Sequence, residues 1–222
     1  MNNFLKKNNI CAVIPFYNES NFIEDILIET SKFVDFIIAV NDGSTDDSIS
    51  KIHHNNNIYL ISYQENRGKG FALNQGFKES INRQFEITVT LDADFQHDPK
   101  LIPELIGALN SYDIIIGDRL DNLQKMPLQR IASNKLTSFF LSIKTGQKLL
   151  DTQCGFRAYK TNILNSILPS KDGFEAESQI LVNAARKNYK IGFVKIPTIY
   201  GTEKSKMKSL RAITGFIKVL LS

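Results

Sequence analysis

The amino-acid sequence predicts one α/β domain over residues 1–222, with a mostly parallel sheet flanked by helices. Short apolar segments rich in β-branched residues alternate with segments of helical period, which is the pattern of βαβ units. No internal repeat, low-complexity segment or Pro/Gly-rich linker divides the chain, and its length is ordinary for one domain. An apolar fraction of 42% and a charged fraction of 23% are typical of a globular protein with its own core.

The first half of the chain is expected to alternate strand and helix. Pro15 is expected to end the first strand. Asn21 and Glu24 have the spacing of a capping box, and an apolar stripe of helical period follows them. We therefore expect strands at residues 10–14, 36–40, 58–62 and 85–91, and helices at residues 22–33 and 70–82.

The second half is expected to continue this alternation. A helix predicted over residues 127–147 has Ile131, Phe139, Phe140 and Ile143 at helical spacing, so these four side chains are expected to face inward. The other expected elements are a helix at 101–109, strands at 114–116, 156–159 and 191–196, a helix at 177–187 and a terminal amphipathic helix.

Charge gathers at the C-terminal end of the chain. The net charge of +4 is too small to predict a nucleic-acid partner, so none is expected. Residues 203–222 carry five basic side chains and one acidic side chain, which accounts for the whole net charge. This segment also has apolar residues at helical spacing, and it is predicted to contact an anionic membrane peripherally. Packing of its apolar face on the core is the alternative.

Cysteine usage and hydropathy predict the compartment. Cys11 and Cys154 have no spacing typical of a disulfide framework or a zinc site, which favours a reducing environment. Residues 1–9 are polar and lack the apolar stretch of a secretory signal. No run reaches the roughly 18 apolar residues that a membrane-spanning helix needs. We therefore expect a cytoplasmic protein, with peripheral contact to the inner face of the cell membrane.

An acidic cluster follows the fourth predicted strand. Asp92 and Asp94 stand two residues apart, so both can reach one cation only if the backbone turns there. Together with the amide oxygen of Gln96 they suit Mg²⁺ or Mn²⁺, which in turn would bridge phosphate oxygens. The alternative is a solvated loop in which Asp98 caps the helix that opens at Pro99.

Two further clusters lie beside predicted strands, where ligands of open α/β sheets bind. Asp42 follows the second strand and could accept hydrogen bonds from a nucleoside, while Gly43 allows close backbone approach. A turn followed by a helix N-cap is the alternative. Residues 66–70 place glycines before a helix, as phosphate-binding loops do, without the complete P-loop pattern.

Together these segments resemble the family-two glycosyltransferases. The matching motifs occur in order along nearly the whole chain, and the nearest resemblance is to polyprenyl-phosphate sugar transferases of the dolichyl-phosphate mannose or glucose synthase type. The motifs are residues 13–19 (VIPFYNE), 41–46 (NDGSTD), 66–70 (NRGKG), 92–97 (DADFQH), 117–119 (GDR), 151–157 (DTQCGFR) and 199–201 (IYG).

The resemblance implies a glycosyltransferase A-type fold, a UDP- or GDP-linked sugar donor, Mg²⁺ or Mn²⁺, and inversion at the anomeric carbon. It also implies a lipid phosphate acceptor and a role in cell-envelope glycan synthesis, although the C-terminal transmembrane segment of longer members is not found in this sequence. Arg157 is added to the implied residues because a guanidinium suits phosphate. The expected roles are catalytic for Asp94, Asp151 and Arg119, donor-binding for Pro15, Tyr17, Glu19, Asp42, Lys69 and Asp92, metal-binding for Asp92, Asp94 and Gln96, and acceptor-phosphate-binding for Arg130, Ser133 and Arg157.

The class of acceptor decides whether a base is needed. A phosphate monoester has a second pKa of about 6, so it is largely ionised at neutral pH and needs cations to place it. A hydroxyl of a glycan or another soluble acceptor needs a base, for which Asp151, Glu175 and Glu177 are candidates. Two alternatives therefore stand beside the lipid-phosphate hypothesis: transfer to a hydroxyl, and binding of nucleotide sugars without catalysis. A nucleotidyltransferase is disfavoured, because residues 15–19 stand where that class has a Gly-rich basic loop.

Overall fold

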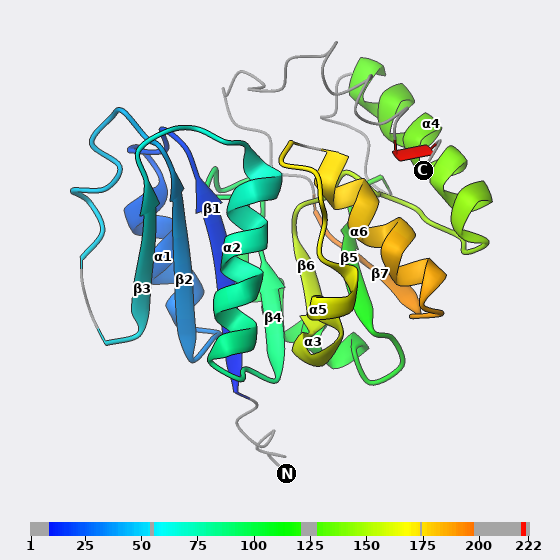
Figure 1. Ribbon diagram of the computed structural model, residues 1–222, viewed down its shortest axis with the longest axis horizontal. Coiled ribbons are helices and arrows are strands. Elements are labelled where there is room, and N and C mark those ends of the chain that lie inside the picture. The colour runs from blue at the N-terminus through cyan, green and yellow to red at the C-terminus, as the bar shows by residue number, and fades with distance from the viewer. Residues whose placement is uncertain (1–8, 54–55, 121–127, 174, 198–218, 221–222) are drawn as a thin grey trace.

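The protein has a central β-sheet flanked by helices (Figure 1). The computed structural model describes residues 9–53, 56–120, 128–173, 175–197 and 219–220. Within these ranges seven strands lie in the order β3-β2-β1-β4-β6-β5-β7, with β6 antiparallel to both of its neighbours and the other pairs parallel. The expected mostly parallel α/β sheet is thereby confirmed. The strands are β1 (Ile10–Phe16), β2 (Phe36–Asp42), β3 (Ile58–Tyr63), β4 (Ile87–Thr90), β5 (Ile114–Asp118), β6 (Arg157–Lys160) and β7 (Ile191–Lys195).

β1 and β2, two interior strands of the sheet, are buried on both faces, as their continuous apolar sequences predict. β1 continues through Pro15, so the expectation that this proline ends the strand is wrong. Pairing with β4 stops at Val13, whereas pairing with β2 continues to Phe16. Pro15 therefore lies where β1 has a paired strand on one side in the described sheet, a position that tolerates the missing N–H.

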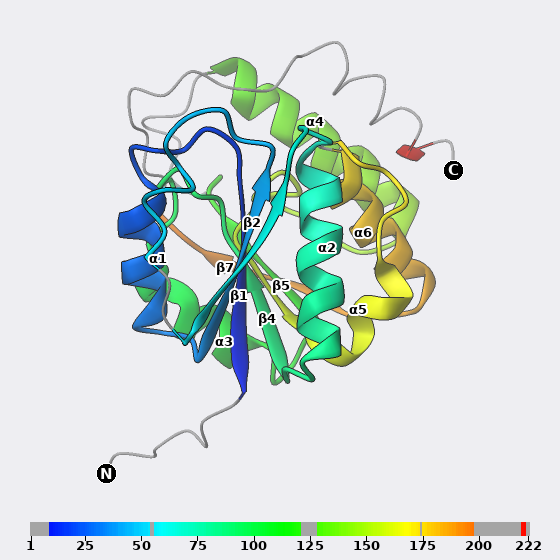
Figure 2. The same cartoon turned by 60° about the vertical axis from the view of Figure 1, so that its left-hand side comes forward.

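Helices cover both faces of the sheet, with α1 and α3 on one face and α2, α5 and α6 on the other (Figure 2). α1 buries Ile23, Ile26 and Leu27 against the sheet, each contributing about 1.5–3 kcal/mol. The predicted capping box is wrong, because no side chain caps α1 and Glu24 instead pairs with His53 at 3.0 Å. The helices are α1 (Ile23–Ser31), α2 (Lys69–Asn82), the 3₁₀ turn η1 (Pro99–Leu101), α3 (Ile102–Ala108), α4 (Leu128–Thr145), α5 (Thr161–Ile167) and α6 (Glu175–Arg186).

Four large apolar residues of α4 lie on its exposed face. The prediction that Phe139, Phe140 and Ile143 face inward is wrong, since their side chains are 59%, 41% and 66% exposed. Leu136 on the same face is 57% exposed. Helical period identifies the apolar face of a helix, and it does not say which face meets the core.

The buried face of α4 is largely polar, and hydrogen bonds to the loop before β6 make this burial possible. Ser138 Oγ accepts from the backbone N–H of Thr152 at 3.1 Å. Thr137 Oγ1 accepts from Gln153 Nε2 at 3.1 Å and donates to a carbonyl one turn earlier. Because these hydroxyls have partners, their burial carries a small desolvation penalty. Leu141 completes the face as a fully buried side chain.

The C-terminal segment predicted to contact membrane lies outside the described residues, except for Val219 and Leu220. Val219 is buried, and the Leu220 carbonyl accepts from Lys144 Nζ of α4 at 2.9 Å. None of the helices that the structure describes is long and apolar enough to cross a bilayer. The division into one domain with a basic tail stays a prediction.

Candidate active site

Loops from distant parts of the chain meet at the edge of the sheet where the parallel strands end. The loops after β1, β2, β4 and β5 lie there, and β6 begins there because it runs antiparallel. Thr90 Oγ1, at the end of β4, donates to the carbonyl of Gly155 at 2.9 Å and so ties the loop before β6 to β4. In open α/β sheets this is the edge where ligands bind.

The loops after β1 and β2 are joined by hydrogen bonds between backbone and side chains. The N–H of Asn18 donates to Ser44 Oγ at 2.9 Å, and the N–H of Glu19 donates to Ser48 Oγ at 2.8 Å. Tyr17 and Glu19, both predicted to bind the donor, are partly buried in this joined pair of loops, while Pro15 is buried in β1. The motif residues of the two loops therefore lie together at this edge of the sheet.

Asp42 holds the glycine-containing loop before α2. Its two carboxylate oxygens accept from the N–H groups of Arg67 at 2.9 Å and Gly68 at 2.7 Å, and the residue is 3% exposed. Gly68 has a φ of 110°, and a Cβ there would lie 2.4 Å from the carbonyl oxygen of Asp172. This loop-shaping role was not predicted from the sequence. Each carboxylate oxygen keeps a further lone pair, and nucleoside binding by Asp42 stays a prediction.

Lys69 forms a buried bridge between two acidic residues. Its ammonium lies 2.7 Å from Asp92 Oδ1 and 3.2 Å from Glu177 Oε1. Burial opposes the charge on Lys69, but the neighbouring Asp92 and Glu177 outweigh it and raise the pKa of Lys69. Burial likewise acts to raise the pKa of Asp92, and the charge of Lys69 outweighs it, so that pKa is lowered. Asp92 is therefore ionised and held by a cation of the protein itself.

Gly155 lets the backbone approach this bridge closely. A Cβ at this position would lie 2.6 Å from Asp92 Oδ2 and 2.8 Å from Lys69 Nζ. Any larger residue would therefore displace the carboxylate or the ammonium. The sequence motif at residues 151–157 includes this glycine, but its spacing alone does not reveal the contact with a loop some sixty residues earlier.

Asp94 has surplus negative charge around it. The backbone turns after Asp92 as expected, with Phe95 at a φ of 57° and Asp94 Oδ1 accepting from the N–H of Gln96 at 3.1 Å. Burial first, and then the charges of Asp92 and Glu19, raise the pKa of Asp94 to about 6. Asp98 accepts from the Lys100 N–H at 3.0 Å, so it caps the 3₁₀ turn as the alternative interpretation expected.

The acidic loop fits a divalent cation that a ligand's phosphates also bind. Among the described residues no group of three or more His, Cys, Asp or Glu side chains is arranged to hold a metal by itself. Mg²⁺ at phosphate sites commonly takes one or two carboxylates and completes its shell with phosphate oxygens and water. Asp92 and Asp94 supply such a pair. Burial first, and then the charge of Asp92, raise the pKa of Asp94, so a nearby cation would favour its ionised form.

Arg119 and Asp151 form a bidentate ion pair beside this loop. Arg119 Nε and Nη2 lie 2.7 Å and 3.0 Å from the two oxygens of Asp151, and the Arg119 N–H adds a third bond at 3.3 Å. Asp151 is fully buried, whereas the Arg119 side chain is 13% exposed. The carboxylate predicted as a base is thus engaged by a guanidinium, and it holds Arg119 at the end of β5.

Arg157 does not reach the site. Its side chain is fully buried, and its guanidinium donates to the backbone carbonyls of Cys154 at 2.7 Å, Thr152 at 2.9 Å and Glu177 at 3.1 Å. These bonds hold the loop before β6 to the start of α6. The structure therefore places Arg157 where an acceptor phosphate cannot meet it, in contrast to the prediction.

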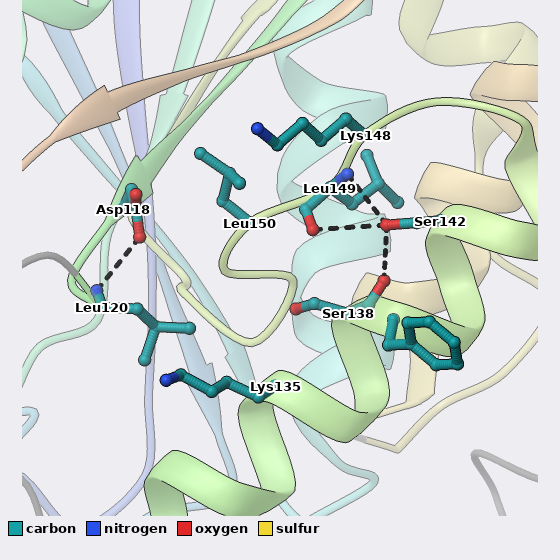
Figure 3. Close-up of a pocket in the computed structure, with 9 residues that line it drawn as sticks. Asp118, Leu120, Lys135, Ser138, Ser142, Lys148, Leu149 and Leu150 are labelled. Carbon is teal, nitrogen blue, oxygen red and sulfur yellow. Dashed lines mark hydrogen bonds between the residues drawn. The ribbon is translucent and has the colours of Figure 1, made fainter.

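An open pocket of about 500 Å³ lies between the end of β5 and α4 (Figure 3). Asp118 lies on one side of it, and Lys135, Phe139 and Lys148 lie on or just after α4. The predicted acceptor residues Arg130 and Ser133 lie three positions apart in the first turns of α4 and so share a face of this helix. Sequence reasoning missed Lys135 and Lys148, which no motif includes.

Comparison with known proteins places the chain among sugar transferases. A family model described as glycosyl transferase family 2 matches residues 11–168. A UDP-N-acetylglucosamine–dolichyl-phosphate N-acetylglucosaminyltransferase of Methanococcus voltae is 32% identical, covering 93% of this chain and 92% of that protein. An undecaprenyl-phosphate 4-deoxy-4-formamido-L-arabinose transferase of Proteus mirabilis is 30% identical, covering 92% of this chain and 65% of that protein.

A solved structure shares the fold at lower sequence identity. Glucosyl-3-phosphoglycerate synthase of Mycobacterium tuberculosis, in complex with Mn²⁺, uridine diphosphate and phosphoglyceric acid, superimposes with a TM-score of 0.73. The two chains are 20% identical, and the match covers 96% of this chain and 78% of that one. This likeness shows the glycosyltransferase A-type fold.

Proposed function

The chain belongs to glycosyl transferase family 2, and on that premise we propose that it is a metal-dependent enzyme that transfers a sugar from a nucleoside diphosphate to a polyprenyl phosphate. The observation that carries the choice of acceptor is the pairing of Asp151 with Arg119. A hydroxyl acceptor needs a base. Of the three carboxylates predicted for that role, Asp151 is fully buried and engaged on both oxygens and Glu177 is paired with Lys69, which leaves Glu175 at the start of α6. A phosphate acceptor is already ionised and needs no such base.

The donor would lie across the loops at the carboxyl ends of β1, β2 and β4. Asp42 and the loop that it holds would meet the nucleoside, and the loops with Tyr17 and Glu19 would enclose it. Lys69 keeps Asp92 ionised and oriented through the 2.7 Å contact. Asp92 and Asp94, with Gln96, would hold Mg²⁺ or Mn²⁺. When bound, such a cation supplies positive charge that stabilises a leaving nucleoside diphosphate.

The acceptor phosphate would approach from the side of β5 and α4. Arg119 directly follows β5, and Asp151 orients its guanidinium. Arg130 and Ser133 lie in the first turns of α4. Lys135 and Lys148 add positive charge to the pocket between these elements. The names of the relatives from Methanococcus voltae and Proteus mirabilis, which specify dolichyl and undecaprenyl phosphates, support this class of acceptor.

Paired acceptors test the proposal. The purified protein is incubated with Mn²⁺, a panel of UDP- and GDP-sugars and either a polyprenyl phosphate or the matching polyprenol. We expect a sugar–lipid product from the phosphate alone. Equal transfer to the polyprenol, or to a soluble glycan hydroxyl, would favour the hydroxyl-acceptor alternative. Binding of a nucleotide sugar with neither transfer nor hydrolysis would instead favour the non-catalytic alternative.

A further inference from the structure

We propose that the outer face of α4, formed by Leu136, Phe139, Phe140 and Ile143, docks the protein on the surface of an anionic lipid bilayer. The four side chains are 57%, 59%, 41% and 66% exposed and lie within two turns of one helix. Phe139 and Phe140 are also in contact with each other, with ring centroids 5.7 Å apart. Single exposed apolar residues are ordinary, but a contiguous apolar patch marks an interaction surface.

The two faces of α4 differ in polarity. Its buried face carries Asn134, Thr137 and Ser138, and its exposed face carries the four large apolar side chains. A helix stabilised only by the core would have the opposite arrangement. The hydrogen bonds of Thr137 and Ser138 to residues 152–153 attach α4 firmly to the domain and leave the apolar face outward.

The positive charge of the segment around this face favours an anionic lipid surface as its binding partner. Residues 128–150 contain four basic side chains and no acidic one, although the whole chain has 23 acidic residues. Lys135 and Lys148 are exposed on or just after α4. Helices that lie in the interface of anionic membranes typically combine aromatic and aliphatic side chains with Lys and Arg. Each basic residue near such a surface adds attraction that salt screens.

The position of the face adds a functional argument, which rests on the proposed function. Phe139 belongs both to the outer face of α4 and to the pocket between α4 and β5. Docking through this face would therefore bring the pocket next to the bilayer, where a polyprenyl phosphate has its chain in lipid and its phosphate at the surface. This face belongs to α4, a different part of the chain from the tail at residues 203–222 that the sequence predicts to contact membrane.

Vesicle binding tests the proposal. The triple variant L136S/F140S/I143S removes three members of the outer face that do not line the pocket, and I28S/I49S removes two exposed apolar residues elsewhere as the matched control. Wild type and control should co-sediment with vesicles that contain anionic phosphatidylglycerol, less as salt rises, and weakly with pure phosphatidylcholine vesicles. The triple variant should bind at least about tenfold more weakly, with an unchanged circular dichroism spectrum and unfolding midpoint.

Three results would overturn the proposal: wild-type affinity in the triple variant, an equal loss in the control, or a wild type that ignores anionic vesicles. A wild-type dimer that the triple variant converts to monomers, without vesicle binding, would assign the face to a second copy of the chain and would overturn it too. Transfer to a short, water-soluble polyprenyl phosphate separates this inference from the proposed function. The triple variant should retain that activity, and docking without any such transfer would refute the proposed function alone.

Discussion

Replacing Lys69 by methionine should destabilise the fold far more than loss of a surface ion pair. The substitution keeps the length of the side chain and removes its charge, leaving Asp92 and Glu177 without the ammonium at 2.7 Å and 3.2 Å. The side chains of Lys69 and Glu177 are 16% and 9% exposed, so little water can replace the lost ammonium group. Breaking a buried pair costs about 3–5 kcal/mol. We expect about 3 kcal/mol, because Asp92 is 30% exposed and Arg157 stays 3.9 Å from Glu177.

Urea unfolding measures this loss. The chain has no tryptophan, so far-ultraviolet circular dichroism is the appropriate signal. With a slope of about 3 kcal/mol per molar urea, the midpoint should fall by about 1 M. Lys32→Met is the matched control, since Lys32 pairs with Glu29 at the surface with side chains 53% and 34% exposed, and it should cost less than about 0.5 kcal/mol.

A second substitution isolates the electrostatic cause. Adding Glu177→Gln to Lys69→Met removes one of the stranded charges, so the double variant should recover more than about 1 kcal/mol relative to the sum of the single effects. Equal stability of the Lys69→Met and Lys32→Met proteins would contradict the role of the buried bridge. The same holds if Glu177→Gln destabilises the Lys69→Met protein by as much as it destabilises the wild type.

Substitutions at Asp94, Asp42 and Gly155 should each have a distinct effect. Asp94→Asn should abolish transfer at limiting Mn²⁺ while leaving the fold intact, because it removes one of the two carboxylates expected on the cation; near wild-type turnover would contradict that role. Burial and Asp92 raise the pKa of Asp94 to about 6, so the ionised form of Asp94 destabilises the cation-free fold. In EDTA, the wild type should therefore gain stability relative to Asp94→Asn as the pH falls through 6. A stability difference between the two proteins that does not change with pH would argue against this. Asp42→Ala should raise KM for the donor more than it lowers kcat, and a fall in kcat at constant KM would show that the residue acts elsewhere. Gly155→Ala should lower the free energy of unfolding in urea by about 1–3 kcal/mol, because the added Cβ would lie 2.6 Å from Asp92 Oδ2. Gly107→Ala is the control: its added Cβ would have no atom within 4 Å, so the change should be neutral or stabilising.

The strands and most helices could be predicted because each has a local period or a continuous apolar segment. The predictions from sequence were wrong where the structure of a segment depends on contacts with other strands or loops. Pro15 stays in β1 because β4 stops short of it. The outward face of α4 depends on hydroxyl partners in another loop. α5, at Thr161–Ile167, is too short for its period to distinguish it from a loop.

The meeting of the candidate loops could also be predicted, because parallel strands bring their carboxyl ends to one edge of the sheet. The pairings inside it could not be predicted, since they join residues far apart in sequence. Lys69 meets Asp92 and Glu177, and Arg119 meets Asp151, through contacts that only the three-dimensional arrangement creates. Arg157 belongs to a matching motif and yet serves the interior of the protein.

The most direct test of the central claim is the identity and amount of the reaction products. The purified protein, Mn²⁺, a sugar nucleotide and a polyprenyl phosphate are incubated, and the lipid and aqueous phases are analysed by mass spectrometry. We expect a lipid in which the sugar is joined to the polyprenyl phosphate, formed in equal amount to the released nucleoside diphosphate and lost when EDTA is added. Nucleoside diphosphate released with no glycosylated lipid, or an undiminished yield of that lipid in EDTA, would contradict it.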